Sequence, residues 1–407
     1  KTIIKIAWRN IWRNKLRSSI VIISIILGIW AGLFISGFTL GMTEQRTKGI
    51  ITTTLSHIQI HNPNFLSNQN INDTIINSKN IIEAIKKDNQ IVVYSERQII
   101  TGMIANAKGN YGIELTGINP EQEKRVTVIS EKLDTGDYFT GRIKHNPIII
   151  GKALAKKMNA RINSKVVITV QNIDGDLVNA AFRIEGIYNT QNSPFELSTA
   201  FVRKSDLAKI TGLTIDKIHE IAILGNSIED APIIVEKLKK YDDKNKIATW
   251  AEVLPELQYT QDMMSSFLYI FMIIVLLALS FGIINSMLMA VLERKKELGM
   301  LMAVGMKKIK IFSMISMETV FLSLIAAPVG LILSYITIQY FSVHGIDLSN
   351  FSSGMESFGV GATIYTYLPA NVYFEITLLT VLIAFISSLF PARRALKLNP
   401  ADAVKSL

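Results

Sequence analysis

Two histidines have a spacing that suggests chemistry. His57 and His61 are four residues apart, which on an α-helix would place two metal ligands on one face. The surrounding segment TTTLSHIQIHNP alternates, however, and predicts a β-strand, on which the two imidazoles would be about 13 Å apart. We therefore interpret them, with Gln59, as solvent-facing strand residues opposite Ile58 and Ile60, and expect no metal site.

No other grouping predicts catalysis. Gly151 and Lys152 lack the preceding glycine and the following Ser or Thr of a phosphate-binding loop. The sequence has no Cys, which excludes disulfides and thiolate metal sites. The aspartates of the predicted turns are scattered and lack a Ser or His partner: Asp134, Asp137, Asp174 and Asp176. We expect a protein without a catalytic site.

A pair of carboxylates suggests binding instead. Glu293 and Glu297 lie four residues apart in the segment LERKKELGMLMAVGMKK, so a helix there would carry both on one face. Apolar residues between Gly299 and Gly305 are unusual for an aqueous loop. They favour a docking surface for a partner, and the alternative is an ordinary solvated loop.

Long apolar runs surround this segment. Each is near or above the roughly 20 residues that a membrane-spanning helix needs, longer than a typical soluble core helix or the apolar part of a cleaved signal peptide. The third run contains Glu318, and the fourth contains Glu375 at its start. The predicted spans are residues 18–42, 263–292, 311–341 and 372–391.

The charges predict the orientation of these spans. Of the 43 Lys and Arg residues, 16 lie in residues 1–17, in the loop 293–310 or in the tail 392–407. Basic short loops stay in the cytoplasm, which leaves residues 43–262 and 342–371 outside. The block 43–262 is nearly neutral, so the net charge of +10 reflects topology and does not indicate nucleic-acid binding.

The block 43–262 is large enough for its own core. Its strand-like and short helical segments predict a mixed α+β domain. We expect a helix with Ser78 as its N-cap, and a hairpin that turns at Asp174 and Gly175, because Asp-Gly accepts the positive φ of such turns. The fold class is therefore a membrane protein with four transmembrane α-helices and a large α+β extracytoplasmic domain between the first two.

Two sequence patterns resemble a known family, the FtsX-like permease subunits of the MacB-type (type VII) ABC transporter superfamily. The family signature E-R-x-x-E-[IL]-G-x-x-x-A-x-G is matched by Glu293, Arg294, Glu297, Leu298, Gly299, Ala303 and Gly305. The family ending P-[AS]-x-[RK]-A-x-x-x-x-P-x-x-A-L is matched by Pro391, Ala392, Arg394, Ala395, Pro400 and Ala403, with Val404 in place of the usual Leu. The layout of spans and outer domain matches over the whole chain.

The resemblance implies a non-enzymatic, multi-pass subunit of a cell inner membrane, with both termini cytoplasmic. It would pair with a second permease, as a homodimer or heterodimer, and bind a cytoplasmic ATPase dimer that holds ATP and Mg, with no cofactor in this chain. The signature segment would be the ATPase-coupling helix. Residues 1–17 would form an amphipathic helix on the inner leaflet, and the periplasmic domain would consist of a porter-like subdomain and an inserted distal subdomain.

Within the superfamily the chain is most similar to the lipoprotein-releasing branch of LolC and LolE subunits. The implied function is ATP-driven extraction of lipoproteins from the membrane for transfer to a periplasmic carrier. The alternative is drug or peptide efflux, or mechanotransmission to a cell-wall hydrolase. In one subunit of this branch a loop hooks the carrier, and the corresponding segment here is either such a hook or a plain connection: Thr190, Gln191, Asn192, Ser193, Pro194, Phe195, Glu196 and Leu197.

The spans contain further candidate residues. Glycines with G-x-x-x-G spacing allow close helix packing, either in a dimer or within one subunit: Gly28, Gly32, Gly37 and Gly41. By the resemblance, aromatic residues of the first two spans would line a central cavity for acyl chains: Phe34, Phe38, Phe267 and Phe271. Glu318 is either a functional intramembrane carboxylate or a side chain that reaches the cytoplasmic interface.

Overall fold

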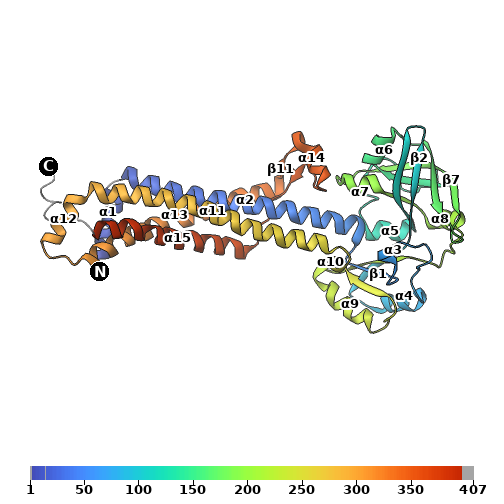
Figure 1. Ribbon diagram of the computed structural model, residues 1–407, viewed down its shortest axis with the longest axis horizontal. Helices are drawn as coiled ribbons and strands as arrows, with labels where there is room; N and C mark the ends of the chain where they lie inside the picture. Colours follow the sequence, from blue (N-terminus) through green and yellow to red (C-terminus); the bar gives the residue numbers. More distant parts are fainter. Residues whose placement is uncertain (1, 14, 397–407) are drawn as a thin grey trace. The chain divides into compact units, whose positions relative to one another are not determined.

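Four helices of the computed structural model are long and apolar enough to cross a membrane, as the apolar runs predict. The structure describes residues 2–13 and 15–396, so Pro400, Ala403 and Val404 of the ending motif lie outside the described residues. The four helices are α2 (Lys15–Ile50), α11 (Pro255–Glu293), α13 (Lys308–His344) and α15 (Ala370–Leu396) (Figure 1). Each extends past its apolar run, because the polar flanking residues continue the helix.

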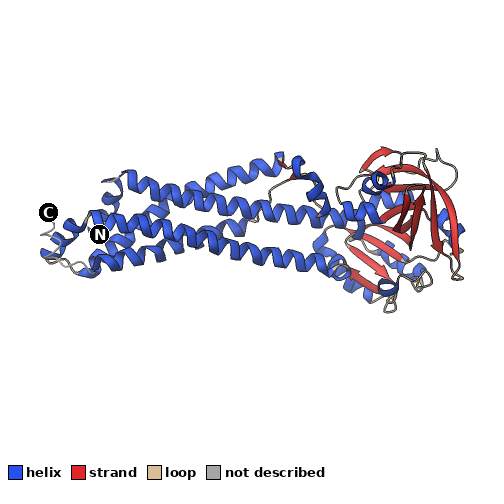
Figure 2. Ribbon diagram, turned by 45° about the horizontal axis from the view of Figure 1, so that its top comes forward, coloured by secondary structure: helices blue, strands red, loops and turns tan. Residues whose placement is uncertain are grey.

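The chain forms two compact units. The membrane unit contains the described residues up to Glu44, Gln261–Ile346 and the residues from Ile364 onward. The α/β unit contains Gln45–Thr260 and Asp347–Thr363. Figure 2 shows that the first unit is built of helices and that the strands of the main sheet belong to the second.

The membrane unit also contains two short helices, α1 (Thr2–Arg13) and α12 (Lys295–Ala303). Its core is a continuous apolar cluster to which α1, α2, α11, α12, α13 and α15 contribute. Helix α2 buries one stripe at every fourth position, formed by Val21, Ile25, Ile29 and Leu33. This spacing keeps the stripe on one face of the helix, and residues of the opposite face such as Ile23 and Leu27 remain about half exposed.

The α/β unit begins at Gln45, within the last turns of α2, which continues as a one-turn π-helix, η1 (Ile51–Leu55). Its strands are β1 (Ile58–His61), β2 (Ile91–Asn106), β3 (Gly109–Ile118), β4 (Leu133–Gly136), β5 (Pro147–Gly151), β6 (Lys165–Gln171), β7 (Leu177–Tyr188), β8 (Thr199–Arg203), β9 (Glu220–Gly225) and β10 (Lys246–Thr249). Its longer helices are α4 (Ser78–Lys87), α5 (Pro120–Val126), α6 (Lys152–Met158), α7 (Ser193–Ser198), α8 (Lys204–Thr211) and α9 (Ala231–Lys239). The loop after α13 adds a two-stranded sheet, β11 (Ile346–Asp347) with β12 (Thr363–Ile364), and the short helix α14 (Ser352–Ser357).

The strands form two lobes that share β2. In the sheet lobe, β10, β1, β9 and the first half of β2 lie side by side, with α4 and α9 packed on the same core. In the barrel lobe, the pairings β2–β3–β8–β5–β7–β6–β2 close into a ring around a core of branched aliphatic side chains. The chain connects to α2 and α11 through the sheet lobe, so the barrel lobe is an insertion. This matches the expected subdivision into two subdomains.

Local predictions in this unit have mixed outcomes. The hairpin is confirmed: β6 and β7 pair antiparallel, and Gly175 has φ +93°. The predicted helix begins at Ser78, but its N-cap is Asn77, whose side chain accepts no capping hydrogen bond.

The interpretation of β1 as half-exposed is wrong. All four of its residues are buried, because β1 lies between β9 and β10 and both of its faces are covered. His61 is 1% exposed and stacks on Phe65 at 5.9 Å between ring centroids. Its Nε2 lies 3.0 Å from the side-chain oxygen of Gln59. Within residues 2–13 and 15–396, no three His, Asp or Glu side chains are grouped to hold a metal ion.

Candidate coupling site

The signature segment forms a helix that is separate from the second span. Helix α11 ends at Glu293, Arg294 leaves the helical conformation with ψ 16°, and α12 begins at Lys295. Two hydrogen bonds close the C-terminal end of α12. The Gly305 N–H donates to the Met302 carbonyl at 3.1 Å, and the Met306 N–H donates to the Leu301 carbonyl at 3.0 Å. This is a Schellman ending, and Gly305, with φ +97°, occupies the left-handed position that such an ending needs.

Arg294 connects three elements at the start of α12. Its Nη1 donates to both carboxylate oxygens of Glu318 in α13, at 3.2 and 3.0 Å. Its Nη2 donates to the backbone carbonyl of Asn10 in α1, at 3.2 Å. The two charged side chains are only 12% and 7% exposed. Glu318 is thus the counter-charge of Arg294, and the ion pair ties α13 to the break between α11 and α12.

Helix α1 packs against the same site. Ala7 and Ile11 are buried in the core of the membrane unit, and Trp8 contacts Phe321 edge to face at 5.8 Å. Nη2 of Arg13 donates to Glu297 in α12 at 2.5 Å, but both of these side chains are about half exposed. Removing one partner of the buried Arg294 pair would therefore cost more than removing one partner of this solvated pair.

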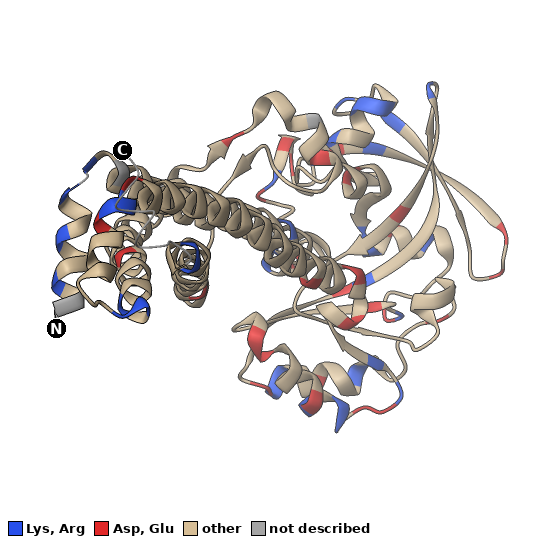
Figure 3. Cartoon of the chain, turned by 60° about the vertical axis from the view of Figure 1, so that its left-hand side comes forward, with Lys and Arg blue, Asp and Glu red and all other residues tan. Residues whose placement is uncertain are grey.

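Helix α12 has one buried side and one open side. Leu298 is 3% exposed and lies in the core, whereas Met300 is 52% exposed and Val304, just past the helix end, is 89% exposed. Glu293 and Glu297 are also exposed, and Figure 3 shows basic residues on the ribbon at this end of the membrane unit. The site can present a short helix with apolar and charged side chains to a binding partner.

The glycines of the first span face other parts of the same chain. A Cβ on Gly28 or Gly32 would approach Leu279 or Met272 of α11 at 3.0 and 2.7 Å. At Gly41 it would lie 2.2 Å from the backbone carbonyl oxygen of Tyr365, so the chain before α15 approaches more closely than any side chain allows. Gly37 likewise faces Ile338 of α13, and its carbonyl accepts a hydrogen bond from the Tyr367 N–H at 2.9 Å.

The four phenylalanines differ in exposure. Phe34 is half-buried, stacks on Trp30 at 5.8 Å and packs against the core. Phe38 and Phe271 are half-buried, and Phe267 is 60% exposed on α11. A cavity of about 210 Å³ lies nearby, between α2, α11 and α15, and its lining contains none of them.

The segment 190–197 forms a short helix. Asn192 caps α7 through its side chain, which accepts a hydrogen bond from the Phe195 N–H at 3.3 Å. The carboxylate of Glu196 is buried and accepts hydrogen bonds from the N–H groups of Thr190, Gln191 and Ala153, at 2.7 to 3.0 Å. Within the α/β unit, the segment also lies against the loop that contains α14: a Cβ on Gly359 would approach Asn192 at 3.4 Å.

Reasoning from the sequence missed the partner of Glu318 and the part that α1 plays. The sequence contains a sign of this contact. Arg294 directly follows the end of α11, Glu318 lies near the start of α13, and the two residues have opposite charges. Only the packing of α13 against α1, however, shows that both charges lie inside the protein.

The fold and this site define a membrane-spanning permease subunit, and comparison with known protein families agrees. Residues 18–241 match the MacB-like periplasmic core domain and residues 269–400 match the FtsX-like permease C-terminal region. The chain belongs to the ABC transporter permeases that combine these two regions.

Relatives named as lipoprotein-releasing proteins match most of the chain. The lipoprotein-releasing system transmembrane protein LolC of Buchnera aphidicola subsp. Schizaphis graminum is 26% identical over 88% of this chain and 86% of its own length. LolC of Neisseria meningitidis serogroup B is 23% identical over 74% of this chain and 75% of its own. Among solved structures, the periplasmic region of MacB from Actinobacillus actinomycetemcomitans covers 52% of this chain and 97% of its own, at 14% identity and a TM-score of 0.36.

Proposed function

We propose that this chain is a non-catalytic permease subunit that couples ATP hydrolysis by a separate cytoplasmic ATPase to movement of the α/β unit, and that it extracts lipoproteins from the inner membrane for transfer to a carrier. ATP and Mg²⁺ would be bound by the partner ATPase. Both termini and α12 would lie in the cytoplasm, where the basic residues favour them.

The open side of α12 is the observation that carries the proposal. Arg294 anchors its start, Leu298 fixes its rotation, and Gly305 closes its end. A helix anchored in this way moves as a rigid body with the spans. Met300 and Val304 give it an exposed apolar patch outside the apolar runs, a feature that marks protein interaction sites.

The relatives named LolC support the choice of substrate, because they match both units of this chain. A lipoprotein carries acyl chains, and the apolar faces of α2 and α11 offer surfaces that suit them. The relatives thus support the proposed substrate, and the ion pairs at α12 support the proposed contact with the ATPase.

Association with the ATPase tests the site. We expect Val304→Glu to abolish co-purification of the ATPase, because a charge would be buried in the apolar contact. Ile233→Glu, at a similarly apolar and 52% exposed position in α9, is the matched control and should leave co-purification unchanged. Equal effects of both changes, or no effect of either, would contradict this role of α12.

Release of substrate tests the function. The complex would be purified from its own membrane and reconstituted, and proteins that co-purify would be examined for attached lipid. On addition of ATP, a lipid-modified protein should pass to the soluble fraction in the presence of a periplasmic extract. ATP-dependent export of a drug or peptide, with no bound lipoprotein, would replace this proposal with the efflux alternative.

A further inference from the structure

The chain passes between the two lobes of the α/β unit twice, and both passages lie at one pair of cross-strand partners. Residues up to Arg97 of β2 pair with β9 in the sheet lobe, and from Gln98 onward β2 pairs with β3 in the barrel lobe. The chain returns to the sheet lobe at Glu220, the first residue of β9. Arg97 and Glu220 are cross-strand partners, so the outgoing and the returning chain cross between the lobes at the same place.

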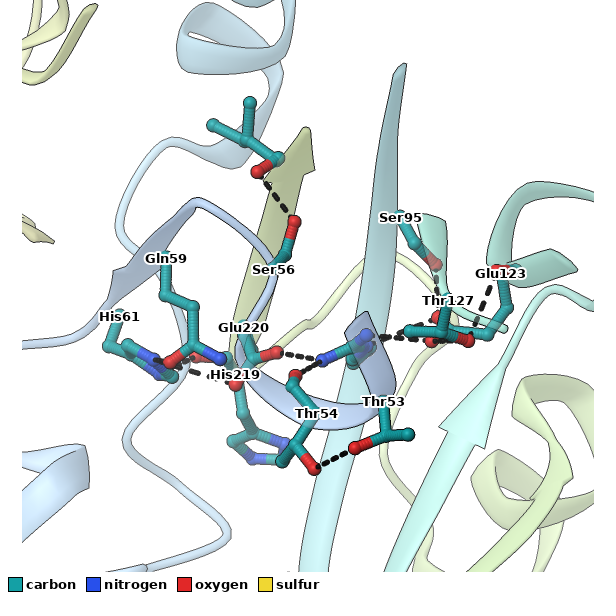
Figure 4. A network of polar contacts seen from close by, with 12 residues as sticks. Thr53, Thr54, Ser56, Gln59, His61, Ser95, Glu123, Thr127, His219 and Glu220 are labelled. Carbon is teal, nitrogen blue, oxygen red and sulfur yellow. Dashed lines mark hydrogen bonds and ion pairs between the residues drawn. The ribbon is translucent and has the colours of Figure 1, made fainter. Parts of the chain in front are cut away.

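A buried charge network occupies this crossing (Figure 4). Nη1 of Arg97 donates to Glu220 at 2.5 Å, and Nε and Nη2 donate to the two carboxylate oxygens of Glu123 at 3.1 and 2.7 Å. Glu123 comes from α5, and its carboxylate also accepts hydrogen bonds from Ser95 and Thr127. Figure 4 shows Glu220 and Glu123 on opposite sides of the network. The guanidinium thus holds both crossing strands and α5 together.

The same guanidinium binds the end of the helix that begins as the first span. Nη1 of Arg97 donates to the backbone carbonyl of Thr54 in η1 at 2.8 Å. This carbonyl lies at the negative end of the helix dipole, which favours a cation. Two further hydrogen bonds fix η1 to the unit: the Val128 N–H donates to the Thr52 carbonyl at 3.1 Å, and Oγ of Ser56 donates to the Ile223 carbonyl at 2.6 Å.

The network is fully enclosed. Arg97, Glu123 and Glu220 are at most 4% exposed. Burial alone would lower the pKa of Arg97, but the carboxylates of Glu123 and Glu220 outweigh it and raise this pKa, so Arg97 stays charged. Leaving one of these buried charges without its partner destabilises the fold by several kcal/mol. Loss of one contact therefore weakens the others.

We propose that Arg97 is the positioning residue that transmits displacement of the first span to the barrel lobe. Helix α2 and η1 are continuous, so movement of the span reaches the Thr54 carbonyl. The guanidinium that binds this carbonyl also binds Glu220 and Glu123, where the chain passes between the lobes. Displacement of the carbonyl therefore displaces the residues that connect the two lobes. This inference rests on the proposed function, in which ATP drives movement of the α/β unit.

Spin labels in the complete complex test this role. The chain has no Cys, so Leu177→Cys in the barrel lobe and Ile233→Cys in the sheet lobe place the only labels on this chain. Both positions are exposed. Electron–electron distance measurements with and without ATP then report movement between the lobes, and the ATPase rate is measured on the same samples.

Three variants separate transmission from folding. Arg97→Lys keeps the charge but cannot bind three acceptors in one planar fork. Arg97→Met combined with Glu123→Gln and Glu220→Gln leaves no unpaired charge, and glutamine keeps acceptors for Ser95 and Thr127. The matched control is Lys204→Met, which removes the 2.7 Å ion pair to Glu96, the neighbour of Arg97 in β2, without touching Thr54.

We expect both Arg97 variants to fold, to bind the ATPase and to hydrolyse ATP, but to lose most of the ATP-dependent distance change. The Lys204 variant should keep it. If the wild-type distance changes with ATP and the folded Arg97 variants change equally, the role of Arg97 is refuted while the proposed function stands. If the wild-type distance does not change with ATP, the lobes do not move relative to each other and this inference fails, whereas the proposed function fails only if ATP also releases no lipid-modified protein.

Discussion

Replacing Arg294 by Met would leave the carboxylate of Glu318 buried without its counter-charge. Breaking a buried ion pair from one side typically costs about 3 to 5 kcal/mol. With the Glu318 side chain 7% exposed, we expect the upper part of this range for the packing of α1 and α12 against α13. Glu318→Met should cost less, because the longer Arg294 side chain keeps its bond to the Asn10 carbonyl and can reach toward water.

The double variant provides the decisive comparison. With both charges replaced by apolar side chains of similar volume, no charge is left unpaired, and buried pairs exchanged in this way are often neutral. We expect the Arg294→Met/Glu318→Met protein to fall within about 1 kcal/mol of the wild type, which gives a strong coupling energy in the double-mutant cycle. Arg13→Met is the matched control. It breaks the half-exposed pair with Glu297 and should cost under about 1 kcal/mol.

The assay uses a native reporter. Trp8 contacts Phe321 of α13, so its fluorescence changes when α1 separates from the bundle. The three other tryptophans, Trp12, Trp30 and Trp250, would be replaced by Phe, and separation would be followed by denaturant titration in detergent. If the single and the double variant are equally destabilised, or if Arg294→Met resembles Arg13→Met, the buried pair does not hold this site.

Three further changes test other parts of the structure. Gly305→Ala must adopt φ +97° and should destabilise the end of α12 by about 1 kcal/mol and weaken ATPase association, whereas Gly282→Ala, in an open helical position, should be neutral or slightly stabilising. Gly41→Ala places a Cβ against a backbone oxygen and should lower the melting temperature of the membrane unit, whereas Gly49→Ala, with open space around it, should not. Burial lowers the pKa of His61 to about 4, so protonation favours the unfolded state and the protein loses up to about 3 kcal/mol as pH falls from 6.5 to 4. His61→Gln should remove this loss of stability. The measurement is amide hydrogen exchange of β1 in the variant and in the wild type at each pH. If the difference between the two proteins is the same at pH 6.5 and at pH 4, His61 does not titrate in this range.

Several features of the α/β unit followed from local sequence patterns. The Asp-Gly turn identified the β6–β7 hairpin, since it needs only the residue type that accepts a positive φ. The alternation around β1 identified a strand but gave the wrong environment for His61, because alternation cannot show that strands distant in the sequence flank β1 on both edges or that other side chains bury both of its faces. Closure of the barrel lobe through the β2–β6 pairing is non-local in the same way.

In the candidate coupling site, too, local patterns predicted the segment, and only the tertiary structure showed its contacts. The pattern from Glu293 to Gly305 located a docking segment, and the family resemblance implied that it forms a helix. It could not show that Arg294 points inward to Glu318, because that contact depends on how α13 and α1 pack.

The sequence by itself determined the four spans and located the α12 segment, because these depend on the length of apolar runs and on local spacing, and its charge distribution predicts the orientation of the spans. The tertiary structure decided which face of α2 is buried, since apolar residues occur on every side of its apolar run and the glycine spacing does not show which helix packs there. It also decided that Arg97, Glu123, Glu220 and Thr54 meet at one place. These residues come from η1, β2, α5 and β9, which are spread over more than a hundred positions of the sequence. Only the fold of the chain brings their polar groups together.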